Sequence, residues 1–314
     1  MAQPHHDHAH DRHDHGHDHG HSHAPRDFGR AFAIAVALNT AFVLTEAGVG
    51  LWSGSLALLA DAGHNLSDVL ALLLAWGAAV LARRAPTPRR SYGMRKATIL
   101  ASLGNAVMLL VAVGAIVSES VRRFFTPAEV ATQAVMITAA IGVVLNTATA
   151  LLFLRGQDDI NVRGAFQHMA ADAAVSLAVV VGAGLMALTG LLWIDPALSL
   201  GIAVVIVLGT AGLLRESIDM ALDAAPRGVD VAAVEAWLAD LPGVVEVHDL
   251  HIWAMSTTET ALTAHVIRPS GEDGDGFLHG ACEGLAARFG IGHATLQMET
   301  GADVVCRLAP TEVV

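Results

Sequence analysis

Two short stretches of the chain repeat the same pairing of a histidine with an aspartate four residues later. The first pair is His64 and Asp68, and the second is His168 and Asp172. A separation of four residues places both side chains of a pair on one face of an α-helix. Two such helices packed face to face would bring two imidazoles and two carboxylates to one point, as in a tetrahedral zinc site. Mg²⁺ and Ca²⁺ would instead favour six or more ligands, mostly oxygens.

Either pair alone has a plainer explanation, because polar side chains in apolar helices also form hydrogen bonds to neighbouring helices. The presence of two copies favours the metal site. Asp61 lies three residues before His64, on the same helical face. It is either an outer-vestibule carboxylate or proton relay, or a residue that caps or hydrogen-bonds a helix near the membrane interface.

Both pairs lie in apolar segments whose lengths suit membrane spans. Of the 314 residues, 54% are hydrophobic and 15% are charged, whereas soluble domains have about 45 to 50% and about 25%. About 20 helical residues cross the roughly 30 Å hydrocarbon layer of a bilayer. The sequence predicts six transmembrane helices, at residues 31–52, 56–82, 97–120, 130–154, 165–190 and 195–214.

The distribution of basic residues predicts that both chain termini lie in the cytoplasm. The connection after the second span carries six arginines and lysines, whereas the connection after the first carries none. Cytoplasmic loops are rich in these residues, so the even-numbered turns face the cytoplasm. Arg122 and Arg123, after the third span, do not follow this pattern. We expect a multi-pass protein of the cell (inner) membrane.

Residues 1–26 form a tail in which ten histidines recur among aspartate and glycine without any apolar run. This composition is typical of a disordered segment, here on the cytoplasmic side; a purification tag or neutral low-complexity sequence is the plainer alternative. The net charge of −12 argues against a nucleic-acid partner, which needs a basic face. The 17 histidines of the chain point to metal ions instead.

The chain changes character after the spans. Residues 27–215 form the predicted membrane domain, residues 216–227 a linker, and residues 228–314 a soluble domain with thirteen acidic residues against three arginines. Helical and extended patterns predict an α-β-β-α-β order, as in a ferredoxin-like α+β domain, at residues 230–240, 244–253, 260–267, 277–289 and 294–298. A domain of this size buries a small core, which dimerisation would enlarge.

These motifs resemble the cation diffusion facilitator family, specifically its zinc-transporting branch. The resemblance rests on the six spans, the C-terminal α+β domain, the stretch Ser55–Asp68 and the His168/Asp172 pair. It implies a homodimeric antiporter, not an enzyme, that exports Zn²⁺ in exchange for protons, with the four motif residues as the transport site. Manganese-selective relatives have Asp-Asp where this chain has His168-Met, and iron-handling relatives have Asp in place of His64. These differences favour zinc, with cadmium as its chemical neighbour.

The resemblance also implies a metal site in the C-terminal domain. His248, His265 and Glu299 occupy positions that match the family's ligands, whereas Gln297 stands where some relatives have histidine. Considered without the family, His248 and His265 could meet across neighbouring strands, although histidines on a soluble domain are usually solvated. The other histidines of the domain are weaker candidates: His251, His279 and His293.

Other readings of the sequence fit less well. Cys282 and Cys306 are too few for a disulfide framework and lack paired spacing, so we expect reduced bystanders. A zinc importer or an intramembrane zinc hydrolase would carry a His-Glu-x-x-His motif, and neither of the two pairs supplies one. A membrane-tethered zinc sensor stays open as an alternative.

Overall fold

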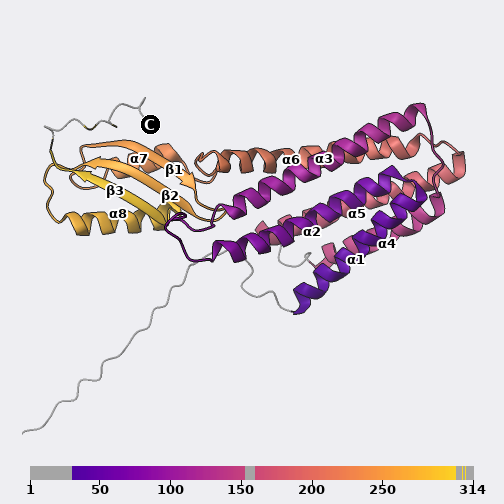
Figure 1. The fold of residues 1–314 in the computed structure, drawn as a ribbon, viewed down its shortest axis with the longest axis horizontal. Coiled ribbons are helices and arrows are strands. Elements are labelled where there is room, and N and C mark those ends of the chain that lie inside the picture. The colour runs from indigo at the N-terminus through magenta and orange to yellow at the C-terminus, as the bar shows by residue number, and fades with distance from the viewer. Residues whose placement is uncertain (1–29, 153–159, 302–305, 307, 309–314) are drawn as a thin grey trace, which may run out of the picture.

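The computed structural model describes residues 30–152, 160–301, 306 and 308. It has two parts, a bundle of long helices and a small α+β domain at one end of that bundle (Figure 1). The histidine-rich tail at residues 1–26 lies outside the described residues, and its disorder stays a prediction.

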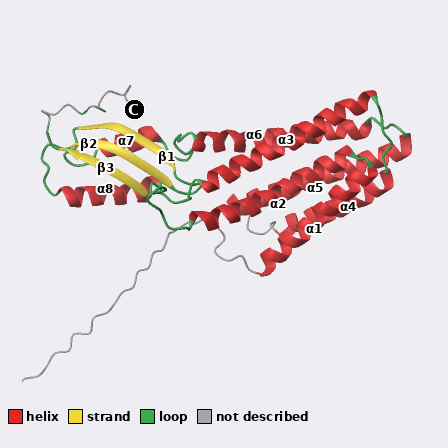
Figure 2. Cartoon of the chain, viewed as in Figure 1, coloured by secondary structure: helices red, strands yellow, loops and turns green. Residues whose placement is uncertain are grey.

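Six long helices form the membrane part of the chain (Figure 2). Their bounds are α1 Arg30–Ser53, α2 Leu56–Ala82, α3 Ala97–Phe125, α4 Thr132–Leu152, α5 Ile160–Thr189 and α6 Ile194–Ala221. Within the described residues, five candidate spans are long and apolar enough to cross a membrane: Leu56–Ala82, Ala97–Phe125, Thr132–Leu151, Phe166–Thr189 and Ile194–Ala221. The predicted helical membrane domain is therefore confirmed, while the crossing by α1 rests on its sequence.

Helix α6 is longer than the sequence suggests. Residues 216–221 were expected to begin a linker, but they are helical and α6 ends at Ala221. Tertiary packing explains the extension, because the Ser217 hydroxyl is fully buried. It lies 3.0 Å from the Ser102 hydroxyl of α3. The chain leaves the bundle only after this contact.

A buried carboxylate joins the helices at the bundle end farthest from the α+β domain. Asp195, in the first turn of α6, is fully buried. Its carboxylate accepts hydrogen bonds from the Ser55 hydroxyl at 2.5 Å and from the Leu56 N–H at 2.7 Å. Arg123 of α3 lies 3.9 Å from Asp195 and donates to the Gly54 carbonyl. Since a buried charge needs such partners, this cluster fixes the start of α2 against α3 and α6.

The C-terminal domain has the predicted order of elements. Its elements are α7 Val231–Ala239, β1 Glu246–Ala254, β2 Thr260–Ile267, α8 Gly274–Phe289 and β3 His293–Glu299. The sheet order is β1-β2-β3, with β1 antiparallel and β3 parallel to β2. The predicted α+β class is therefore confirmed.

One face of this sheet packs on the two helices and the other carries polar side chains. Val234 of α7, Leu285 of α8 and Leu262 and Ala264 of β2 share a single buried core. Because successive side chains on a strand alternate between faces, His265 lies on the face away from the helices. That face holds the candidate metal ligands described below.

Replacing Asp195 by alanine should destabilise the bundle. The substitution removes the acceptor of the Ser55 and Leu56 donors and the partner of Arg123, and each buried group left unpaired costs about 1 to 3 kcal/mol. Thermal unfolding of the detergent-purified protein should therefore shift to lower temperature. Glu129→Ala is a matched control, because Glu129 is an exposed acid near the same bundle end. Equal melting temperatures for the two variants would contradict this role of Asp195.

Candidate metal centres

The two histidine–aspartate pairs meet between α2 and α5. His64 Nε2 lies 3.3 Å from Asp172 Oδ1, and His168 Nε2 lies 3.3 Å from Asp68 Oδ2. His168 Nε2 also lies 3.6 Å from Asp172 Oδ2, and the two imidazole rings are 5.9 Å apart. Each of the two 3.3 Å contacts thus joins the histidine of one motif to the aspartate of the other. This crossed pairing requires the two helices to run in opposite directions.

The separations within this cluster suit a small tetrahedral ion. With Zn–N and Zn–O bonds of about 2.0 to 2.2 Å, neighbouring ligand atoms lie about 3.3 to 3.6 Å apart. Both cross-helix contacts are 3.3 Å long. His64, His168 and Asp172 offer ligand atoms that all lie within 4.8 Å of one another. Asp68 does not belong to that set of three residues. Its carboxylate lies next to the set, in contact with His168.

The cluster opens toward the end of the bundle that carries the α+β domain. The exposed fraction of the side chain rises from 4% for Asp172 and 23% for His64 to 35% for Asp68 and 44% for His168. The last two residues lie nearer that end. Buried apolar side chains of α2 and α5 close the opposite side: Ala57, Leu58, Ala60, Val179, Ala183 and Met186. The cluster is therefore more exposed on the domain side than on the far side, where apolar side chains pack.

A second polar link between α2 and α5 lies one turn from the cluster, on the sealed side. The Ser176 hydroxyl donates to Asp61 Oδ2 at 2.8 Å, and Asn65 Nδ2 donates to Glu46 Oε2 at 3.2 Å. Glu46, Asp61 and Ser176 are fully buried. Asp61 therefore forms a hydrogen bond to a neighbouring helix, which is one of the two roles its position suggested.

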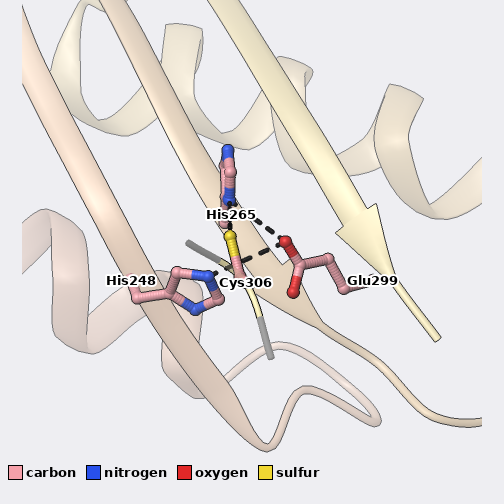
Figure 3. A group of neighbouring side chains, drawn as sticks. All are labelled: His248, His265, Glu299 and Cys306. Carbon is pink, nitrogen blue, oxygen red and sulfur yellow. Dashed lines mark hydrogen bonds and ion pairs between the residues drawn. The ribbon is translucent and has the colours of Figure 1, made fainter. Parts of the chain in front are cut away.

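Four side chains converge on the outer face of the small sheet (Figure 3). His248 of β1 and His265 of β2 are direct partners across the two strands, and their rings lie 5.1 Å apart. Glu299 Oε1, at the end of β3, lies 3.1 Å from His265 Nδ1 and 3.7 Å from His248 Nε2. Cys306 Sγ lies 3.4 Å from His265 Nδ1. Each of the four side chains offers one ligand atom, and these four atoms all lie within 4.8 Å of one another.

The surroundings of His248 fit a metal ligand. The side chain is buried, yet neither of its ring nitrogens has a hydrogen-bond partner within the described part of the chain. Buried polar atoms without partners are rare, and an ion in the cluster would satisfy Nε2, the ring nitrogen that lies 3.7 Å from Glu299 Oε1. Two imidazoles, a carboxylate and a thiolate form a ligand set that suits Zn²⁺.

Sequence reasoning missed Cys306 in this group. It found His248, His265 and Glu299 but treated both cysteines as bystanders, because no paired cysteine spacing exists. The one available signal was proximity, since Cys306 follows Glu299 by seven residues. Gln297, two residues before Glu299, donates from Nε2 to Glu299 Oε1 at 3.0 Å, so it can orient the carboxylate.

A strand irregularity adds a further carboxylate to the same face. The register of β1 against β2 shifts between His248 and His251, and Asp249 has a positive φ of 50°. Asp249 Oδ2 lies 3.5 Å from His265 Nε2. Metal-bound histidines commonly use their second nitrogen in such a contact. Asp249 Oδ1 lies 2.9 Å from His251 Nε2, so His251 pairs with the carboxylate and stays out of the cluster.

The two remaining histidines of the domain lie elsewhere. His279 Nε2 is 3.3 Å from Glu283 Oε1 on the exposed surface of α8. The His293 ring lies 5.5 Å from the Tyr92 ring. Neither belongs to a group of ligands among the described residues.

Comparison with known proteins identifies the family of the chain. Residues 32–220 match the cation efflux transmembrane domain, and residues 226–301 match the cytoplasmic domain of cation efflux proteins. The chain is 35% identical over 268 residues to the zinc transporter ZitB of Escherichia coli (strain K12), covering 84% of this chain and 85% of that protein.

Two further relatives cover a similar share of the chain. One is the metal cation efflux system protein CzcD of Cupriavidus metallidurans, 33% identical over 268 residues, with 85% of each chain covered. The other is a cadmium, cobalt and zinc/H(+)-K(+) antiporter of Bacillus velezensis. It is 32% identical over 275 residues, which cover 86% of this chain and 88% of that protein. A solved structure, the metal-bound C-terminal domain of CzcD, is 38% identical and covers 23% of this chain and 99% of its own, with a TM-score of 0.22.

The helical bundle and its soluble domain define a multi-pass membrane transporter rather than an enzyme. The chain belongs to the cation efflux family, in which the C-terminal domain is cytoplasmic. The domain side of the bundle is therefore the cytoplasmic side, and the end that carries Asp195 is the outer end.

We expect Cys306→Ser to weaken zinc binding at the sheet by at least about tenfold, because serine is a poor zinc ligand. Competition between the protein and a chromogenic chelator measures the affinity, in a chain without residues 1–24 so that the histidine tail does not contribute. Cys282→Ser is the control, since burial raises the pKa of the Cys282 thiol and the residue lies outside the cluster. An unchanged affinity in Cys306→Ser would exclude the thiolate as a ligand.

Proposed function

We propose that the chain is a proton-coupled antiporter that exports Zn²⁺ from the cytoplasm. The substrate ion would bind between α2 and α5, held by His64, Asp68, His168 and Asp172. The observation that carries this proposal is the pair of crossed histidine–aspartate contacts, each 3.3 Å long. Two of the relatives, a zinc transporter and an antiporter for cadmium, cobalt and zinc, support the same substrate class.

The ligand set favours zinc over the other common divalent ions. Imidazole nitrogens suit zinc, whereas Mg²⁺ and Ca²⁺ need more oxygen ligands than this cluster offers. Two carboxylates neutralise the charge of the ion, which makes two acidic groups tolerable inside the bundle. Cd²⁺ accepts the same donors and is the second candidate substrate.

Proton coupling follows from the same contacts. Zinc binds only neutral imidazole and ionised carboxylate, so binding of the ion releases protons and protonation releases the ion. Each histidine faces an aspartate of the other helix, an arrangement that can hold a proton between them. Protons from outside would then displace zinc once the sealed outer side of the bundle opens and the cytoplasmic side closes.

The cytoplasmic domain would bind zinc as a regulator and join two copies of the chain. An ion held by His248, His265, Glu299 and Cys306 would connect all three strands to the segment that follows β3. Such a site makes the shape of the domain depend on cytoplasmic zinc, and coupling between the two sites would link zinc level to transport rate. A homodimer fits the small core of this domain.

Replacing either His64 or Asp172 by alanine should abolish exchange of zinc for protons. Because changes to residues that merely support a metal ligand already cost about 10- to 100-fold, we expect losses of more than about 100-fold when a ligand itself is removed. The measurement is ⁶⁵Zn flux together with internal pH in reconstituted vesicles that carry an imposed proton gradient.

His279→Ala serves as the control, because it removes an exposed histidine that lies far from both clusters. All three variants should insert and elute as the wild type does. Wild-type exchange in His64→Ala or Asp172→Ala would rule out this transport site. Zinc movement in the direction of the proton flow, instead of against it, would indicate an importer. Zinc binding without any zinc flux would indicate a sensor.

A further inference from the structure

A basic cavity lies where the second and third membrane helices meet the cytoplasmic domain. Its volume is about 450 Å³, and it is lined by the loop between α2 and α3, the first turn of α3 and the end of β1. Because one candidate span ends at Ala82 and the next begins at Ala97, the cavity sits at the membrane boundary. Neither metal cluster contributes a residue to it.

One wall of the cavity is cationic, and part of its charge is left unpaired among the described residues. Arg95 Nη1 lies 2.9 Å from Glu259 Oε1, so its charge is paired. Arg89 and Arg90 have no carboxylate within 4.0 Å among the described residues, and Arg90 Nη1 donates only to the sulfur of Met94. Two guanidinium groups therefore face the cavity with their charge available to an anion.

Another part of the cavity lining is apolar and aromatic. Leu100, in the first turn of α3, is 61% exposed, and Tyr92 is exposed as well. Trp253 of β1 and the buried Met255, which directly follows this strand, line the same cavity. A ligand that satisfies both walls carries a negative charge and an apolar part. The anionic lipids of the cytoplasmic leaflet have this chemistry and occupy this level of the bilayer.

The loop that presents the two arginines has a fixed shape. Thr87 and Arg90 pair through both backbone groups, and the Arg90 N–H also reaches the Thr87 hydroxyl at 3.2 Å. Gly93 has a φ of 70°, and a side-chain carbon there would lie 3.2 Å from the Arg84 carbonyl. The backbone that carries the two arginines is thus held by its own contacts before any ligand binds, which lowers the entropic cost of binding.

We propose that this cavity binds the headgroup of an anionic phospholipid, with Arg89 and Arg90 on the phosphate and the acyl chains along Leu100. The bound lipid would bridge α3 and β1, and so connect the membrane domain to the cytoplasmic domain. Basic loops of this kind also direct membrane insertion, but that role requires neither a cavity nor an apolar wall. The proposal does not depend on the identity of the transported ion.

The test uses the full-length protein in detergent with added phosphatidylglycerol or phosphatidylcholine, and counts bound lipids by native mass spectrometry. The wild type should retain phosphatidylglycerol preferentially. Each arginine near an anionic lipid surface is worth about fivefold in affinity, so Arg89→Gln/Arg90→Gln should weaken phosphatidylglycerol binding by about 25-fold and leave phosphatidylcholine binding unchanged.

Arg83→Gln/Arg84→Gln is the matched control. It removes the same charge from the same loop, at exposed residues that do not line the cavity, and should leave the preference intact. Equal losses in both double variants would mean diffuse attraction to the loop and would overturn the proposal. Displacement of the lipid by millimolar inorganic phosphate would also overturn it, because the cavity would then be a site for a soluble anion.

Discussion

The opposed packing of α2 and α5 is the constraint on which the rest of the structure depends. It sets the histidine of each helix against the aspartate of the other, 3.3 Å apart in both cases. Four ionisable side chains inside a membrane bundle are costly unless they neutralise one another or hold an ion. The Asp61–Ser176 hydrogen bond and the buried apolar side chains of the outer half join these two helices directly, and Asp195 fixes the start of α2 against α3 and α6.

The local part of this arrangement could be predicted from sequence, because helical periodicity places His64 with Asp68 and His168 with Asp172. The crossing itself could not. Counted from the predicted span ends, the two pairs miss each other by about one turn. The predicted fifth span starts at residue 165, whereas α5 starts at Ile160. Propensity and hydropathy define span ends too loosely to fix the relative depth of two helices.

Other features that the sequence left unexplained have equally specific physical causes. Arg123 lies at the outer end of the bundle, against the usual placement of basic residues, because it pairs with buried Asp195 and the Gly54 carbonyl. Cys306 joins the cytoplasmic cluster through tertiary contacts that no spacing rule describes. The strands were predictable from their apolar alternation, but the irregularity at Asp249, which places a carboxylate beside His265, depends on an unusual backbone conformation.

The contacts between the membrane domain and the C-terminal part of the chain are individually weak. Arg95 with Glu259 and Lys96 with Asp223 are exposed ion pairs, and pairs of this kind contribute about 0 to 1 kcal/mol each. The Thr257 N–H adds one hydrogen bond of 3.1 Å to the Thr98 hydroxyl. Under the proposed mechanism, such weak contacts would let the cytoplasmic domain transmit zinc binding to helices that rock against each other.

X-ray absorption at the zinc edge tests the central claim most directly. The sample is the chain without residues 1–24 and with His265→Ala and Cys306→Ser, so that zinc bound to the tail or the sheet does not contribute. We predict one zinc per protomer with four nitrogen or oxygen neighbours at about 2.0 to 2.2 Å, and loss of that ion in Asp172→Ala. A six-coordinate shell, or a four-coordinate shell that survives Asp172→Ala, would contradict the account.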